Sequence, residues 1–137
     1  MAALSQTAAN VIPATGASKK TVVAGGTVTA GMPVYKDTAD SDEYKACRAN
    51  AAGTANCDGI ALNGASDGQP LEIQTTGGIN LGATLTVGET YCVSDAVAGQ
   101  IVPIGDLGST DYVTVLGIAT TASNLKMAIN NSGVQKP

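Results

Sequence analysis

Hydrophobic and polar residues follow one another in short runs from residue 21 to the C-terminus, and glycines separate these runs. Runs of roughly four to eight residues that are rich in β-branched side chains and bounded by turn residues are typical of β-strands. No stretch repeats its hydrophobic residues with the period of an amphipathic helix over several turns. The pattern predicts strands in the following segments: residues 21–37, 43–49, 58–65, 69–75, 77–95, 99–104, 111–120 and 124–130.

The clearest alternation places Leu71 and Ile73 on one face of a predicted strand, with polar residues on the other face. The last predicted strand alternates in the same way, with Leu125, Met127 and Ile129 directed inward. About 9 to 11 short strands, spaced roughly 8 to 12 residues apart, are typical of a small barrel or sandwich. We therefore expect an all-β fold, a small antiparallel β-barrel or β-sandwich.

Two local features of the pattern carry further predictions, and the second leaves a choice of structure. The glycines between the predicted strands indicate reversals of the chain, and one of these is expected at Gly77–Gly78. Residues 40–52 contain several alanines and Glu43, so they also permit a short helix as an alternative to a strand.

Residues 1–20 differ from the rest of the chain. They are rich in Ala, Ser, Thr and Asn and contain one apolar cluster, Val11, Ile12 and Pro13. They show neither the period of a helix nor a strand alternation of useful length. We expect residues 1–20 to form an extended N-terminal arm and residues 21–137 to form a single β-rich body.

The composition indicates a core built from small contacts. Hydrophobic residues make up 44% of the chain, but Phe and Trp are absent and Tyr occurs four times. Because aromatic side chains bury the most apolar area, such a core is thin, and packing against copies of the same chain or a partner would add stability. We therefore expect an oligomer.

The charges and the lack of a long apolar run argue against two classes of partner. Seven basic and eleven acidic residues give a net charge of −4, and the basic residues are scattered. Binding to a phosphate backbone needs a concentrated positive surface, so we expect no nucleic-acid partner. No run of about 18 apolar residues occurs, and the N-terminus lacks the pattern of a secretion signal, so we expect no membrane association.

Candidate chemistry is sparse. The chain has no histidine, which removes the usual general base at neutral pH and every triad built on it, so we expect no enzyme and no cofactor. Cys47, Cys57 and Cys92 are too few for a structural zinc site, and their odd number argues against a full set of disulfides. Free thiols are the favoured interpretation. A hairpin between Cys47 and Cys57 would make a disulfide between these two residues the alternative.

Acidic residues gather between two predicted strands, at Asp37, Asp40, Asp42 and Glu43. Closely spaced carboxylates suit calcium, but this spacing departs from the calcium-loop pattern and lacks its central glycine. A solvated turn in which Asp and Ser side chains cap their own backbone is the favoured interpretation, with a calcium site as the alternative.

The basic residues and glycines give no specific signature. Lys19, Lys20 and Arg48 are either solvated charges or contacts to an acidic partner surface. No phosphate-binding loop occurs among the glycines, because none is followed by lysine in the required pattern.

Several glycine-spaced phrases resemble one protein family. They are G-x-P-V-Y at 31–35, D-G-I-A at 58–61, G-x-x-Y-x-V-S at 88–94 and L-G-I-A at 116–119. Across about residues 21–130 the chain resembles the small head-decoration, or capsid cement, proteins of tailed bacteriophages. Similar phrases also occur in phage fibre and other virion surface domains.

The resemblance implies a β-rich, commonly trimeric body that sits on the assembled shell and ties neighbouring subunits of the major capsid protein together. It also implies that an N-terminal arm makes part of that contact. We therefore expect a structural virion protein, made in the host bacterial cytoplasm and located on the outer capsid surface. The expected capsid contacts are Val11, Ile12, Pro13, Lys19 and Lys20.

Two other classes remain as alternatives. A virion spike or fibre domain that binds a host receptor or glycan would use loop residues such as those around Asp37–Glu43 and the tyrosines. A bacterial surface or pilus-like subunit would need a secretion signal, which the N-terminus does not show.

Overall fold

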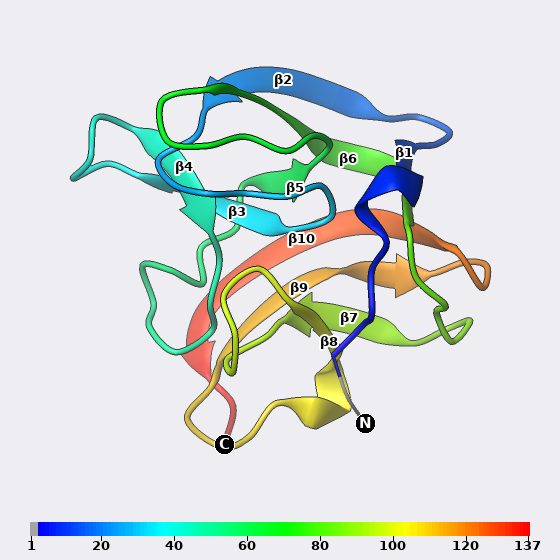
Figure 1. The fold of residues 1–137 in the computed structure, drawn as a ribbon. Helices are drawn as coiled ribbons and strands as arrows, with labels where there is room; N and C mark the ends of the chain where they lie inside the picture. The colour runs from blue at the N-terminus through cyan, green and yellow to red at the C-terminus, as the bar shows by residue number, and fades with distance from the viewer. Residues whose placement is uncertain (1–2) are drawn as a thin grey trace.

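The computed structural model describes residues 3–137, which form ten strands and two short 3-10 helices (Figure 1). This confirms the expected all-β fold of about 9 to 11 strands. The elements are η1 (Ala8–Asn10), β1 (Val11–Pro13), β2 (Ser18–Val23), β3 (Pro33–Asp37), β4 (Glu43–Ala46), β5 (Gly59–Ala61), β6 (Pro70–Leu81), β7 (Thr90–Val93), β8 (Ile101–Pro103), η2 (Ile104–Asp106), β9 (Tyr112–Ala119) and β10 (Asn124–Gln135).

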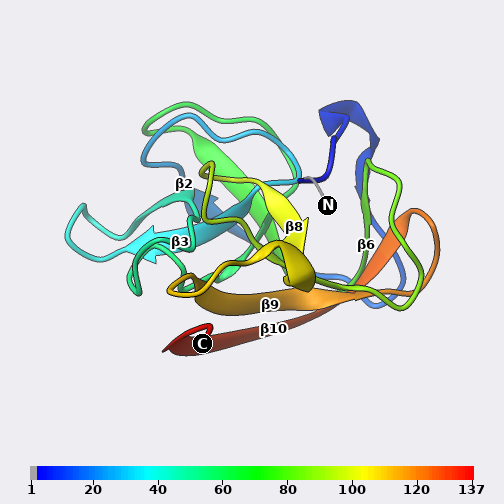
Figure 2. The same cartoon turned by 90° about the horizontal axis from the view of Figure 1, so that it is seen from below.

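All the strands belong to one curled antiparallel sheet with the order β4-β3-β5-β6-β10-β9-β7-β8, and β1 and β2 also pair with β6. The long strand β6 joins two halves of the molecule. Its first half lies between β2 and β5, where Ile73 pairs with both Lys20 and Ala61. Its second half lies between β1 and β10, where Ile79 pairs with Pro13 and Leu125. Figure 2 shows β9 and β10 along one side of the curl.

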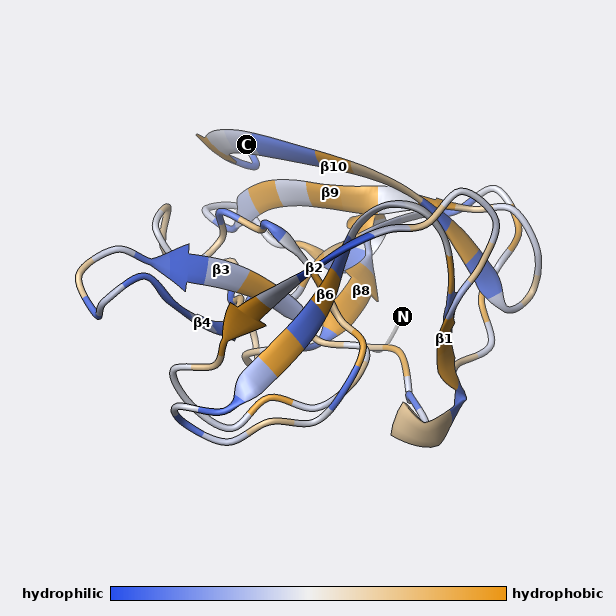
Figure 3. Ribbon diagram, turned by 90° about the horizontal axis from the view of Figure 1, so that it is seen from above, coloured by the Kyte–Doolittle hydropathy of each residue, from blue (hydrophilic) through white to orange (hydrophobic). Residues whose placement is uncertain are grey.

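Small aliphatic side chains fill the interior in separate clusters. In Figure 3, hydrophobic and hydrophilic bands alternate along β6, as expected for a strand with one face in the core. One cluster fills the curl of β2 to β6, with Ala24, Val28, Val34, Tyr44, Ala61, Ala65, Leu71 and Ile73. The largest cluster includes residues of β1, β5, β6, β7, β9 and β10, among them Val11, Ile60, Ile79, Leu81, Tyr91, Leu116, Leu125 and Met127. A third, with Cys92, Val102 and Leu107, lies near η2.

Two side-chain amides hold the sheet together where β5 and β10 diverge from β6. The Gln74 amide donates to the carbonyls of Thr76 (3.0 Å) and Gly78 (2.7 Å). The Asn131 amide donates to the carbonyl of Cys57 (2.8 Å) and accepts from the N–H of the same residue (2.9 Å). The Asn131 amide therefore links β10 to Cys57, and the Gln74 amide adds a second donor to the carbonyl of Gly78, which also accepts from the N–H of Ala14.

Residues 3–20, which belong to the expected extended N-terminal arm, lie against the body. The N–H of Leu4 donates to the carbonyl of Ile101 (2.9 Å), and that of Thr7 donates to the carbonyl of Gly82 (2.7 Å). The apolar cluster forms β1 and pairs with β6. The expected boundary after residue 20 falls within β2. Met1 and Ala2, the first residues of the expected arm, lie outside the described residues.

The structure corrects one local expectation and confirms another. Gly77–Gly78 is not a reversal, because β6 runs through both glycines as a 12-residue strand. The positive φ of Gly77 (93°) allows the strand to continue past the close backbone of Gly16. Residues 43–46, where a helix was the alternative, form β4. Within residues 3–137, no helix has the length and hydropathy that a membrane span requires.

Candidate functional site

The cross-strand register places several residues of β1, β6, β7, β9 and β10 on one face of the sheet, which we call the outer face. Paired residues on neighbouring strands point to the same side, and so do residues two apart on one strand. Two rows of paired residues follow from this rule. The outer face is made of Ile12, Asn80, Thr90, Ile118, Asn124 and Lys126.

Exposed apolar side chains stand on the outer face beside a cation. Ile12 is 54% exposed and Ile118 is 50% exposed. Lys126 pairs directly with Ile118 across the strands, and its ammonium has no hydrogen bond or ion pair within residues 3–137. Two half-exposed isoleucines and an unpaired cation make the outer face the candidate docking surface of this chain.

Two cavities open beside this face, next to the N-terminal segment. The first has a volume of about 310 Å³ and is lined by Ala14, Thr15, Gly77, Gly78, Thr120, Asn124, Lys126 and Met127. The second has a volume of about 460 Å³ and is lined by Ser5, Thr7, Asn10, Ile12, Asn80, Gly82, Ala83, Thr84 and Ser123. The surface around β1 is therefore hollowed on both sides of the Asn80–Asn124 pair.

The expected contact residues of the apolar cluster divide between the two faces of β1. Val11 is buried (7% exposed) in the largest core cluster, where it pairs with Leu81. Ile12 points outward on the outer face, and Pro13 is half-buried. Of these three residues, Ile12 alone offers an exposed apolar side chain to a partner.

The expected basic contacts, Lys19 and Lys20, lie on β2, apart from Ile12. Lys19 approaches Glu72 at 4.0 Å. Lys20 donates to Asp58 Oδ2 at 2.8 Å, and its ammonium lies 5.6 Å from the centre of the Tyr44 ring. The structure therefore does not bring the two lysines and the apolar cluster into one site.

Lys20, Tyr44 and Asp58 form a hydrogen-bonded cluster. The Tyr44 hydroxyl also donates to Asp58 Oδ2, at 2.6 Å. Burial alone would raise the pKa of Asp58, but the hydrogen bonds from Lys20 and Tyr44 outweigh it, so the pKa lies below its ordinary value. The bond to Asp58 raises the pKa of Lys20. Beside the cluster is a polar cavity of about 340 Å³, lined by Lys20, Lys36, Tyr44, Asn56, Cys57, Asp58 and Asn131.

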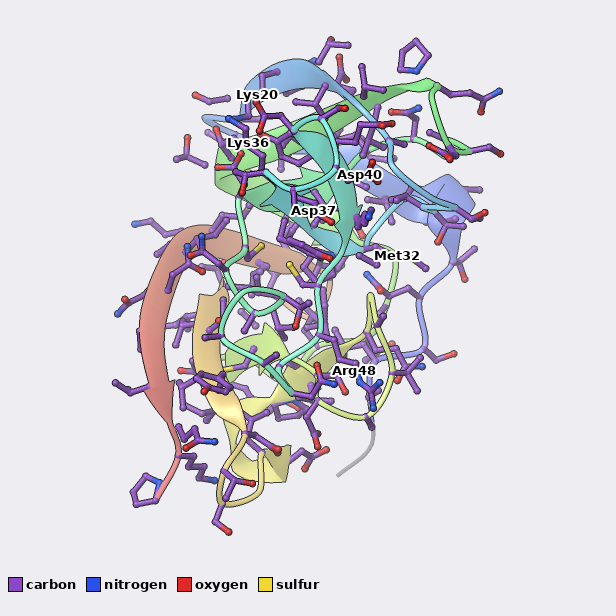
Figure 4. The ribbon with its side chains drawn as sticks, turned by 90° about the vertical axis from the view of Figure 1, so that its left-hand side faces the viewer. Lys20, Met32, Lys36, Asp37, Asp40 and Arg48 are labelled. Carbon is purple, nitrogen blue, oxygen red and sulfur yellow. The ribbon has the colours of Figure 1, made fainter. Side chains whose placement is uncertain are left out.

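Two carboxylates of the acidic loop between β3 and β4 are paired with a lysine of β4. Lys45 Nζ contacts Asp37 Oδ2 at 2.8 Å and Asp40 Oδ2 at 3.0 Å. The N–H of Ala39 donates to Asp37 Oδ1 (3.1 Å), as expected for a self-capping turn. Among residues 3–137, no group of three acidic or sulfur side chains has an arrangement suited to a metal. Figure 4 shows Asp37 and Asp40 on the side of the molecule that also carries Lys20 and Lys36.

Cys47, Cys57 and Cys92 are buried free thiols. Cys47 and Cys57 are nonetheless in contact, and burial raises the pKa of the Cys47 thiol well above its ordinary value. Burial also raises the pKa of Cys92, to about 11. Arg48 donates from Nε to the carbonyl of Asp95 (2.6 Å), away from Lys20 and Lys36 (Figure 4).

Sequence reasoning missed Ile118 and Lys126 as surface residues of one site. The alternation in the last strand places Lys126 outward, but only the register with β9 shows that Ile118 is beside it. Comparisons of the chain with protein-family models, with curated proteins and with solved structures give no match.

Proposed function

We propose that this chain is a structural virion protein that binds the outer surface of an assembled tailed-phage capsid. In this proposal, it stabilises the shell by bridging neighbouring subunits of the major capsid protein. The observation that carries the proposal is the outer face, with Ile12 and Ile118 half exposed on a rigid sheet. The resemblance of the strand phrases to phage head-decoration proteins supplies the partner.

The N-terminal segment contributes to this contact in a preformed shape. β1 is fixed to β6 by strand pairing, so Ile12 is presented without the ordering cost that a disordered arm has on binding. Burying an exposed isoleucine side chain contributes up to about 1.5–3 kcal/mol. Ile12 and Ile118 are each about half exposed, so a specific contact also needs the polar residues of the outer face and multivalent binding.

The proposed oligomer is a homotrimer, which would multiply this contact. Once one subunit is bound, the others bind at a high effective concentration, which raises the apparent affinity by about 10² to 10⁴. A protein that binds the assembled shell, and neither its precursor nor the unfolded subunit, stabilises that shell by mass action.

A mixing experiment tests the proposal. Mature and immature phage-type capsids that lack a decoration protein are incubated with the chain, sedimented and heated. We expect saturable co-sedimentation with mature capsids and a raised disruption temperature. A folded chain that binds neither capsid form contradicts the proposal.

Paired variants locate the contact. Ile12→Ser with Ile118→Ser should abolish co-sedimentation because both exposed anchors of the outer face are removed. The matched control changes Val23 and Val97, which are 46% and 51% exposed elsewhere, to Ser. Equal loss of binding in the two double variants would contradict the assignment to the outer face.

A second candidate function is a virion spike or fibre domain that binds a host glycan. One observation favours it, the polar cavity beside Tyr44 with its amide, carboxylate and ammonium groups. Binding to a glycan array, lost in Asn56→Ala and retained in the double variant of Ile12 and Ile118, would establish this function in place of capsid binding.

A further inference from the structure

We propose that the cavity beside Lys126 receives a carboxylate side chain of the partner protein. This inference rests on the proposed function for the identity of the partner, the major capsid protein. The preference of the cavity for a carboxylate is inferred from residues of this chain alone. We therefore expect the major capsid protein to have an acidic residue where it contacts the outer face of this chain.

The cavity is rich in hydrogen-bond donors. The ammonium of Lys126, the amide of Asn124 and the hydroxyl of Thr15 have no side-chain hydrogen bond within residues 3–137. A further hydroxyl, that of Thr120, has only a long contact of 3.5 Å to the carbonyl of Asn124. The lining contains no carboxylate. Lys126 brings a positive charge to a lining that holds no negative one, and the hydroxyls and the amide can donate beside it, so the complementary ligand is an anion.

The walls of the cavity are fixed by backbone pairing. The N–H of Ala14 donates to the carbonyl of Gly78 (2.8 Å), and the N–H of Gly78 donates to the carbonyl of Thr15 (2.9 Å). Lys126 pairs with Gly78 on the other side. Asn124 and Lys126 therefore stand on β10, which is already in register, as a specific contact requires, and Thr15 lies in the turn that the bonds to Gly78 hold in place.

The surroundings favour a protein carboxylate over a free phosphate. One lysine supplies the cavity's positive charge, and Ile118 lies directly beside it on the outer face. A single cation next to exposed apolar surface matches a partner surface in which one acidic side chain stands among apolar ones. The chain as a whole carries a net charge of −4 and repels an acidic partner, so the local positive charge of Lys126 determines where a carboxylate can bind.

Charge variants of Lys126 test the proposal in the capsid assay. Lys126→Met keeps the length and apolar stem of the side chain, and we expect it to weaken capsid binding by about tenfold or more. Lys126→Glu should weaken it further. Lys36 on β3 provides matched controls, because it is also an exposed strand lysine with only a 4.0 Å approach to an acid. Lys36→Met and Lys36→Glu should bind within about twofold of the unchanged chain.

A titration without capsids tests the cavity separately. The ¹⁵N-labelled chain is titrated with the peptide acetyl-Ala-Glu-Ala-amide and with its Gln counterpart. We expect saturable NMR shifts at Thr120, Asn124 and Lys126 with the Glu peptide, and no such shifts with the Gln peptide or in Lys126→Met. Inorganic phosphate is a third arm, and tighter binding of phosphate than of the Glu peptide would overturn the choice of a protein carboxylate.

The outcomes separate this inference from the proposed function. Capsid binding that is unchanged in both Lys126 variants overturns the inference and leaves capsid binding in place. Glu-specific shifts without any capsid binding by the unchanged chain support the carboxylate site and overturn the capsid partner. Absence of both capsid binding and Glu-specific shifts overturns both.

Discussion

Asp58 is hydrogen-bonded to β2, β3 and β4 through its carboxylate and its backbone N–H. Its Oδ2 accepts from Lys20 on β2 and from Tyr44 on β4, and its own N–H donates to the carbonyl of Val34 on β3 at 2.8 Å. A carboxylate held by two donors favours its ionised form, so its pKa in the folded state is below the ordinary value of 3.8.

Stability should therefore depend on Asp58 at low pH. Because its folded-state pKa is lowered, its contribution is present above the ordinary carboxyl value and is lost as the pH falls through the folded-state value. We expect Asp58→Asn to cost about 1 kcal/mol at pH 7, since Lys20 and Asp58 both remain well exposed, and to cost less near pH 2. Urea unfolding at both pH values measures this. An equal cost at both would contradict it.

Lys20 should act in the opposite direction at high pH. Its pKa is raised above 10.5, so its contribution is complete below that value and is lost as the pH rises through the raised pKa. We expect Lys20→Met to lose its destabilising effect in strongly alkaline solution. Urea unfolding at pH 8 and at pH 12 measures this, with the unchanged chain as the reference.

Asn131 should matter more than its exposure suggests. Its amide satisfies both the N–H and the carbonyl of Cys57, and Cys57 is buried. Loss of that amide removes the partner of the Cys57 carbonyl, while the Cys57 N–H keeps its bond to the carbonyl of Ala55 (2.9 Å). Asn131→Ala should therefore cost about 1–3 kcal/mol in the free energy of unfolding, mainly through the Cys57 carbonyl. The neighbouring exposed residue Asn130 is the control, and Asn130→Ala should cost less than about 0.5 kcal/mol. Equal costs would show that the bridge to Cys57 contributes nothing.

At the scale of elements, the strands could be predicted where one face is buried. Leu125 and Met127 are buried and Ile129 packs against the core, as the alternation predicts. The pairing of β1 with β6 could not be predicted, because three residues carry too little pattern and their partners are far away in sequence. The outer face depends on this long-range register, so its residues could not be grouped from the sequence either.

β1 provides a direct test of the two faces. Val11→Ala removes two buried methyl groups and should destabilise the fold by about 2 kcal/mol without weakening capsid binding by the folded chain. Ile12→Ala, at the adjacent outward position, should leave the free energy of unfolding within about 0.5 kcal/mol and weaken capsid binding. Thermal unfolding and co-sedimentation measure the two effects. If both variants changed stability and capsid binding to the same extent, β1 would not be divided into a buried and an outward face.

Gly77 should tolerate no side chain, because β6 passes close to the turn that joins β1 and β2. Its φ is 93°, and a Cβ there would collide with the backbone of Gly16. Gly77→Ala should therefore cost about 3 kcal/mol or more. Gly16, in the same turn, has a φ of 78° but open space around it, so Gly16→Ala should cost about 1 kcal/mol. Chemical unfolding of both variants separates the clash from the conformational strain.

At the scale of the whole molecule, the core is made of small side chains. The largest fully buried side chains are aliphatic, apart from the amide of Gln74, whose Oε1 has no partner among the described residues. A 137-residue chain with such a core gains stability if it buries further surface against copies of itself. Oligomerisation would then contribute to the stability of each subunit as well as to multivalent binding.

We propose a homotrimer, the number that the resemblance to head-decoration proteins implies, with a stability that depends on concentration. Light scattering should give a mass three times the 13.5 kDa of the chain. The melting temperature should rise with protein concentration, because dilution favours dissociation and unfolding. The double variant of Ile12 and Ile118 should remain trimeric, since the outer face is reserved for the capsid in the proposed function. If that variant is monomeric while the unchanged chain is trimeric, the outer face is the subunit interface, and the capsid contact must lie elsewhere. A monomeric unchanged chain would instead remove the multivalent gain in affinity, so that each copy would have to bind through one outer face alone.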